Sequence, residues 1–282
     1  MDQKYLDKLM LDMKLKNFTP STMEGYHTYV RIFLEFIRKD AMQATYSDIR
    51  RFVFYLKDQQ NKMPSTINCY TAALKFFFEY TLEYQWNAKK VPKMKRDRKI
   101  PVILSREEVD ALIDSYDNLK HKAMVSTMYS SGLRVSEVCR LKYGDVLRSK
   151  SMIYVSKSKN RQDRNTILSE RNLEILTAYW YHCGRPMDWL FPSQITGGPL
   201  TSDAVLLFTS GQAEKIGLES HVTPHTMRHC FAVHLLEDGV SHTFIQQLLG
   251  HRSPGSTEVY LQMTSKALMG IRSPFDVRGK QL

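Results

Sequence analysis

The sequence predicts a mainly α-helical protein with one small β-hairpin or sheet, divided into an all-helical first domain and an α+β second domain. Apolar residues recur at helical spacing through most of the 282 residues, and short β-type runs occur only within residues 151–168. A proline-containing basic segment, residues 89–99, interrupts the helical pattern and predicts an extended linker. The 43% hydrophobic content is enough for two buried cores, which excludes a disordered basic tail protein.

The first domain, residues 1–88, is expected to be a small helical bundle. Thr19 offers a hydroxyl cap and Pro20 stands in the first turn of a helix, Ser47 is expected to begin a second helix, and Pro64 a third. Aromatic residues at this spacing favour a core over a base-stacking surface. They are Phe76, Phe77, Phe78 and Tyr80.

The second domain begins after the linker with a capping-box pattern, in which Ser105 precedes Glu108 by three residues. Two β-type runs, residues 152–155 and 165–168, flank a polar, basic connection and predict a hairpin with a protruding tip. The remaining segments have helical periodicity. They are residues 121–130, 169–182, 202–216, 224–237, 241–249 and 256–269.

Positive charge is concentrated in the linker. The chain has a formal net charge of +11, and residues 89–99 contain seven basic side chains and one acidic one. A basic linker of this kind is expected to lie along the phosphates of a nucleic acid, where it adds affinity without sequence choice; a solvated spacer is the alternative. The residues predicted to contact DNA are Lys89, Lys90, Lys93, Lys95, Arg96, Arg98 and Lys99, with Lys159 and Arg161 in the hairpin connection.

Several classes of protein are excluded or disfavoured. No apolar run approaches the roughly 18 residues that span a bilayer, and the N-terminal segment has no signal-peptide pattern, so we expect a cytoplasmic protein with no membrane partner. Phosphate-binding P-loop, dinucleotide-binding and hydrolase-elbow motifs are absent. The cysteines are expected to be buried free thiols rather than disulfides. They are Cys69, Cys139, Cys183 and Cys230.

A histidine-rich segment stands out near the C-terminus. His225 and His229 have the i, i+4 spacing of a zinc site, but Arg228 lies between them and would oppose a dication, so no metal is expected. His229 and His234 are expected to be core histidines. His225 and Arg228, at i, i+3, share a helical face and could both reach one phosphate, which the planar fork of arginine suits.

Three further motifs accompany this pair: an arginine in the string GLRVSEV, a histidine in IQQLLGH, and a tyrosine in STEVYLQ. With PHTMRHCFAVHLLEDGV, these strings make the chain closely similar to the tyrosine recombinases, also called the phage integrase family. The resemblance covers essentially the whole chain, and it implies a SAM-like core-binding domain at residues 1–88, a linker at 89–100, a catalytic domain at 101–264 and a tail for protomer exchange at 265–282.

The resemblance also implies roles for individual residues. Arg134 and Arg228 would clamp the scissile phosphate, His225 and His251 would complete the cage, Glu137 would support them, and Tyr260 would be the nucleophile. Lys157 matches the lysine of the family's β-hairpin, where relatives usually read Gly-Lys-Gly. Here the string is SKSK, so Lys159 remains the alternative.

These residue types suit the implied chemistry. A phenol with a pKa of about 10 is a poor nucleophile at neutral pH and needs assistance. Arginines and histidines would stabilise charge on the phosphate oxygens, and a lysine would protonate the 5′-oxygen that leaves. The product would be a 3′-phosphotyrosyl link that stores the phosphodiester's energy, so neither a metal nor another cofactor is expected.

The resemblance implies double-stranded DNA with short inverted repeats as the partner, and a homotetramer on two sites, with or without a paralogous recombinase. The tail is expected to dock on a neighbouring protomer, and packing on its own domain is the alternative. The simple architecture favours a mobile-element integrase acting at the bacterial nucleoid, with Xer-type resolution of chromosome or plasmid dimers close behind. A non-cleaving DNA-binding accessory factor and a type IB topoisomerase-like enzyme are the alternatives from other classes.

Overall fold

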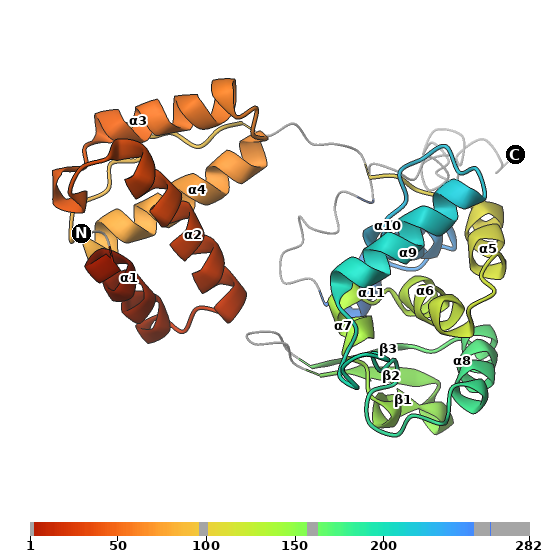
Figure 1. The fold of residues 1–282 in the computed structure, drawn as a ribbon. Helices are drawn as coiled ribbons and strands as arrows, with labels where there is room; N and C mark the ends of the chain where they lie inside the picture. Colours follow the sequence, from red (N-terminus) through yellow and green to blue (C-terminus); the bar gives the residue numbers. More distant parts are fainter. Residues whose placement is uncertain (1–2, 96–100, 157–162, 251–259, 261–282) are drawn as a thin grey trace, which may run out of the picture. The chain divides into compact units, whose positions relative to one another are not determined.

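A computed structural model describes residues 3–95, 101–156, 163–250 and Tyr260. The chain divides into two compact units, Met1–Lys99 and Ile100–Leu282. Each unit is described by itself (Figure 1). Among the residues described, no helix is both long and apolar enough to cross a membrane.

The first unit is all-helical, as the sequence predicts. Thr19 caps its second helix by accepting a hydrogen bond from the Thr22 amide, and Pro20 occupies the first helical position. Two of its helices continue into a π-helical turn, Tyr55–Gln59 and Phe77–Thr81. The α-helices are α1 (Gln3–Leu15), α2 (Pro20–Ile37), α3 (Tyr46–Phe54) and α4 (Pro64–Phe76), with a short 3-10 turn at Ala41–Gln43.

The start of α3 differs from the prediction. Thr45, and not Ser47, is the cap: its side chain accepts a hydrogen bond from the Asp48 amide, and the Asp48 carboxylate accepts one from the Thr45 amide. This reciprocal pair satisfies two amides at once, which a cap two residues later would not do.

The aromatic side chains of the first unit form its core. Phe77 and Phe78 are at most 2% exposed and Phe76 is also buried, which confirms the predicted core position of these three. Tyr80 differs, because it is exposed and the ammonium of Lys16 lies 4.2 Å from its ring centre.

The first part of the basic segment is anchored to this unit. Val91 is buried in the core, and the Met94 backbone exchanges two hydrogen bonds with the side-chain amide of Asn68. The lysines around these anchors point into solvent, since Lys89, Lys90, Lys93 and Lys95 are all exposed. Arg96, Arg98 and Lys99 lie outside the described residues.

The second unit contains helices around one three-stranded antiparallel sheet, in the order β1-β2-β3. The pairing joins Val146 to Ile153 and Met152 to Ile167. Ser105 and Glu108 form the predicted capping box. The helices are α5 (Arg106–Asp114), α6 (Leu119–Ser131), α7 (Val135–Cys139), α8 (Glu170–His182), α9 (Ser202–Lys215), α10 (Pro224–Glu237) and α11 (His242–Leu249); the strands are β1 (Val146–Leu147), β2 (Met152–Val155) and β3 (Arg164–Ile167); 3-10 turns span Tyr143–Asp145 and Arg148–Lys150.

Helix α6 lies at the centre of this unit and packs against both α8 and α10, while α11 contacts β3 (Figure 1). The predicted helix over residues 256–269 lies outside the described residues, apart from Tyr260. All four cysteines are free thiols, but Cys69 and Cys183 are exposed, so the expectation of burial holds only for Cys139 and Cys230.

Candidate active site

Helix α10 places an arginine at the centre of the second unit. Arg228 is only 3% exposed, and its guanidinium donates hydrogen bonds to the carbonyls of Gly132 (2.5 Å) and Leu249 (2.6 Å). These carbonyls stand at the C-terminal ends of α6 and α11, where helix carbonyls have no partner within the helix. Arg228 therefore joins the ends of two helices.

Two glycines make this convergence possible. Gly132 and Gly250 both have φ near +60°, the left-handed conformation that favours glycine. A Cβ on Gly132 would approach the Phe231 ring to 2.4 Å, and one on Gly250 would approach Cδ of Arg164 to 2.9 Å. Both turns thus require glycine for conformation and for space.

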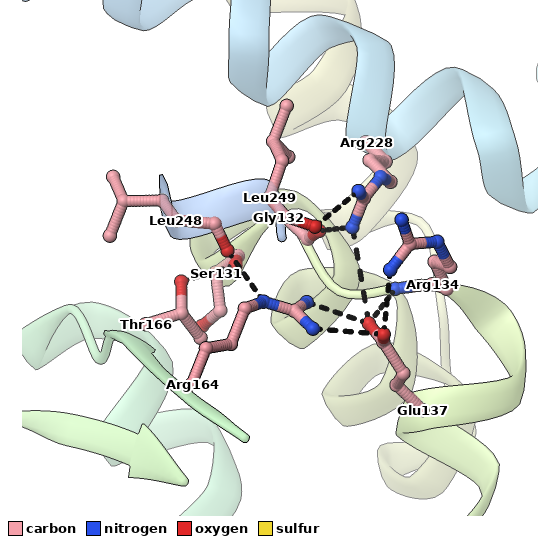
Figure 2. A network of polar contacts seen from close by, with 9 residues as sticks. All are labelled: Ser131, Gly132, Arg134, Glu137, Arg164, Thr166, Arg228, Leu248 and Leu249. Carbon is pink, nitrogen blue, oxygen red and sulfur yellow. Dashed lines mark hydrogen bonds and ion pairs between the residues drawn. The ribbon is translucent and has the colours of Figure 1, made fainter. Parts of the chain in front are cut away.

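A single carboxylate holds three arginines together (Figure 2). Glu137 accepts hydrogen bonds from the Arg134 guanidinium (2.8 Å) and from both terminal nitrogens of Arg164 (2.9 and 2.8 Å). It also accepts one from the Arg134 amide, and an Arg228 nitrogen lies 3.9 Å from it. The carboxylate is therefore the common anchor of the cationic cluster.

The charges in this cluster are strongly perturbed. Burial disfavours the carboxylate form of Glu137, but the hydrogen bonds and charges of Arg164 and Arg134 outweigh it and lower its pKa to about 2. Burial, together with the neighbouring Arg134, lowers the pKa of Arg228 to about 9. Both groups are charged at neutral pH, so the cluster has a net positive charge that suits an anion.

Substitution of Glu137 by glutamine is expected to lower the free energy of unfolding by about 3 kcal/mol at pH 7. The folded pKa lies below the ordinary value of 4.5, so this stabilisation is present above pH 4.5 and disappears as pH falls toward 2. Urea unfolding of the full chain between pH 2 and 7 measures the difference. Glu174→Gln, at an exposed carboxylate of α8, is the control. A Glu137→Gln difference that stays constant with pH would contradict the assignment.

Arg164 is a member of the cluster that sequence reasoning missed. The pattern placed it in the polar connection of the hairpin, whereas the structure places it at the start of β3 with its side chain only 11% exposed. Besides binding Glu137, it donates a hydrogen bond to the Leu248 carbonyl (2.7 Å), so it joins the sheet to α7 and α11. The clue available in the sequence was an arginine directly before a β-type run.

Tyr260 lies against the same helix as Arg228. Its hydroxyl is 2.9 Å from Nδ1 of His229, and the residue is only 3% exposed. Its ring belongs to an apolar cluster with residues of α10 and α11. Burial raises the pKa of the phenol, although the charges of Arg228 and Arg134 oppose the rise. Tyr260 is therefore seated beside the cationic cluster of its own chain.

The three histidines of α10 have different surroundings. His234 is buried and bonded to the Tyr129 hydroxyl and the Leu104 carbonyl, so its predicted core position is confirmed. His225 is exposed, and its ring centre lies 6.4 Å from that of His229. His229 is half-buried and partnered with Tyr260, which differs from the core position predicted for it.

The structure therefore brings Arg134, Glu137, Arg228 and Tyr260 together, with His225 one turn from His229 on α10. Within the part of the chain that the structure describes, no group of three or more histidine, cysteine, aspartate or glutamate side chains could hold a metal ion. The remaining site residues predicted in the second unit lie outside the described residues. They are Lys157, Lys159, Arg161 and His251.

Comparisons with known proteins show the family of the chain. Residues 103–266 match the phage integrase family, and residues 5–88 match the N-terminal SAM-like domain of phage integrases. A putative integrase/recombinase y4qK of Sinorhizobium fredii is 39% identical over 94% of this chain and 86% of its own. The tyrosine recombinase XerA of Pyrococcus horikoshii is 30% identical over 93% and 90%.

The fold is also similar to that of lambda integrase in the structure of its dimer bound to a core site. The TM-score is 0.75 at 17% identity, over 92% of this chain and 94% of that one. A helical SAM-like domain followed by this mainly helical domain defines the class of tyrosine-type site-specific recombinases and integrases. The chain belongs to the phage integrase family, and its second unit contains the tyrosine recombinase catalytic domain.

Proposed function

We propose that this protein cuts and rejoins duplex DNA through a 3′-phosphotyrosyl intermediate, with Tyr260 as the nucleophile. The observation that carries the proposal is the position of Tyr260. Its hydroxyl is bonded to His229, the residue that directly follows the buried Arg228. A nucleophile next to fixed cations is the arrangement that phosphoryl transfer requires.

Arg134 and Arg228 would stabilise the charge that develops on the non-bridging oxygens of the scissile phosphate. Their common anchor, Glu137, fixes the Arg134 guanidinium before DNA arrives, so little reorganisation is needed during the reaction. The backbone carbonyls of Gly132 and Leu249 fix Arg228 in the same way. His225, exposed on the same helix, would complete the cage with His251.

Lys157 is proposed as the general acid for the 5′-oxygen, with Lys159 as the alternative. Lys157 follows the last residue of β2 by two positions, and Arg164, which binds Glu137, begins β3. The strand pair is therefore bonded to the arginine cluster at the end that adjoins this segment. This connection supports a lysine delivered from the hairpin.

The proposed partner is double-stranded DNA with short inverted repeats, bound by a homotetramer on two sites. The exposed lysines anchored around Val91 and Met94 support non-specific phosphate contacts at the end of the first unit. The lambda integrase of similar fold is a dimer on a core site. We also propose that the tail, residues 265–282, docks on a neighbouring protomer.

For the biological role we propose integration or excision of a mobile element. The higher identity to a putative integrase/recombinase, 39% against 30% for XerA, supports this role over resolution of chromosome or plasmid dimers. A non-cleaving accessory factor is the alternative from another class of protein. The position of Tyr260, with its hydroxyl bonded to His229, argues against this alternative.

A strand-exchange assay tests the proposal. Inverted repeats in the DNA that flanks the gene supply the candidate site, and a plasmid with two directly repeated copies is the substrate. The expected result is excision of a circle by the wild-type protein. Relaxation without excision would indicate a topoisomerase, and binding without any cleavage would indicate an accessory factor; either result would contradict the proposed function. Recombination at the repeats that flank the gene, rather than at a replicon-dimer site, supports the mobile-element role.

A further inference from the structure

We infer that His229 is a further catalytic residue, the base that takes the proton from the Tyr260 hydroxyl as that oxygen attacks the phosphate. This inference rests on the proposed function, because it assigns a partner to the proposed nucleophile. His229 is not among the residues to which the family resemblance assigns a role.

The geometry for proton transfer is already present. Nδ1 of His229 lies 2.9 Å from the Tyr260 oxygen, within the distance of a hydrogen bond between the two. The two ring centres are 5.6 Å apart. Tyr260 is 3% exposed, in an apolar cluster with Phe231, Leu236 and Leu249, so it is shielded from bulk water. A base must lie within this reach of the proton that it removes.

The surroundings of His229 keep its ring neutral before the reaction, so Nδ1 has a lone pair available for the phenol proton; because the low pKa also makes the ring a weak base, the proton moves only as the oxygen attacks. Burial, and then the neighbouring His225 and Arg228, lower the pKa of His229 to about 4. Burial also raises the pKa of the Tyr260 phenol, so the hydroxyl does not ionise unaided at neutral pH. Attack by the phenol therefore requires a proton acceptor on its oxygen, and Nδ1 of His229 lies in that position.

His225 is the rival base on the same helix. Its ring centre is 6.4 Å from that of His229, and it is exposed rather than seated on the phenol. The phenol hydroxyl lies 2.9 Å from Nδ1 of His229. The arrangement therefore favours His229 on the attacking oxygen and leaves His225 for the phosphate.

The step balances in atoms and electrons. The Tyr260 O–H bond breaks and its proton goes to Nδ1 of His229, while the phenolic oxygen forms a bond to phosphorus. The bond between phosphorus and the 5′-oxygen breaks, and that oxygen takes a proton from the general acid, proposed as the Lys157 ammonium. Rejoining reverses each transfer, and the imidazolium returns its proton to Tyr260.

The test is single-turnover adduct formation on a nicked substrate with the cognate site, comparing wild type with His229→Asn. Asparagine keeps a hydrogen-bond acceptor close to the position of Nδ1 but cannot take a proton. The expected loss is roughly 10²–10⁴-fold in rate, with DNA affinity and thermal unfolding unchanged. A rate equal to that of wild type would overturn the assignment.

A second arm separates proton transfer from positioning. A fluorinated tyrosine at position 260 has a more acidic phenol, which needs a base less. It should restore much of the rate in His229→Asn and change the wild-type rate little. A defect of the same size with both tyrosines would show that His229 only supports the nucleophile. Absence of any adduct with the wild type would instead contradict the proposed function itself.

A third measurement needs no variant. Transfer requires the proton of neutral His229 to reside on Nε2, so that Nδ1 is free to accept. Nitrogen-15 NMR of the histidine side chains in the wild-type chain identifies the tautomer. We expect the Nε2–H form at neutral pH, and an Nδ1–H form for His229 would overturn the inference.

Discussion

Tyr260→Phe is expected to abolish the covalent protein–DNA adduct on a nicked substrate that carries the cognate site. Phenylalanine keeps the ring in its apolar cluster on α10 and α11, but it lacks the oxygen that would bind phosphorus. No other tyrosine among the described residues is bonded to His229. The loss should therefore be complete, and not a partial slowing.

Gel electrophoresis under denaturing conditions measures the adduct, and a binding assay measures affinity for the same DNA. Affinity should be retained, since phosphate contacts do not depend on the phenol hydroxyl. Thermal unfolding controls for the integrity of the second unit. An adduct that persists in Tyr260→Phe would contradict the assignment of Tyr260 as the nucleophile.

Arg134→Gln is expected to slow adduct formation by roughly 10²–10³-fold, the usual cost of one lost transition-state donor. Arg134 is a better choice than Arg228, whose removal would leave the carbonyls of Gly132 and Leu249 without their partner. After the substitution Glu137 keeps its two hydrogen bonds to Arg164, so the cluster retains its anchor.

The phosphate chemistry gives this prediction a specific readout. A methylphosphonate at the scissile position removes one negative charge, so stabilisation by Arg134 matters less. The slowing of adduct formation by Arg134→Gln should therefore be smaller on this substrate. Arg140→Gln, at an exposed arginine after α7, controls for the loss of one positive charge. An equal defect in Arg140→Gln, or one unaffected by the neutral phosphonate, would show that Arg134 acts through general DNA affinity.

Local signals in the sequence predict most helices of both units. Thr19 with Pro20, Pro64, and Ser105 with Glu108 mark helix starts that the structure confirms, because caps and first-turn prolines act over three or four residues. The strand β1 was missed because its two residues are too short for an alternating pattern. The cap of α3 was misplaced because Thr45 and Ser47 carry the same functional group.

The site is less visible in the sequence, because its contacts join distant residues. The motifs single out Arg134 and Arg228, but no local pattern shows that Glu137 binds Arg164, which is 27 residues away. His229 was expected to be a core histidine, since helical spacing indicates only which face a residue occupies. Its bond to Tyr260, 31 residues away, depends on how the chain returns to α10.

The most direct measurement is mass spectrometry of the protease-digested adduct, formed by the wild-type chain on a nicked substrate with the cognate site. The proposed mechanism predicts a single modified peptide, with the 3′-phosphate of the cleaved strand linked to the Tyr260 oxygen. A nucleotide on any other residue, or a link to a 5′-phosphate, would contradict it.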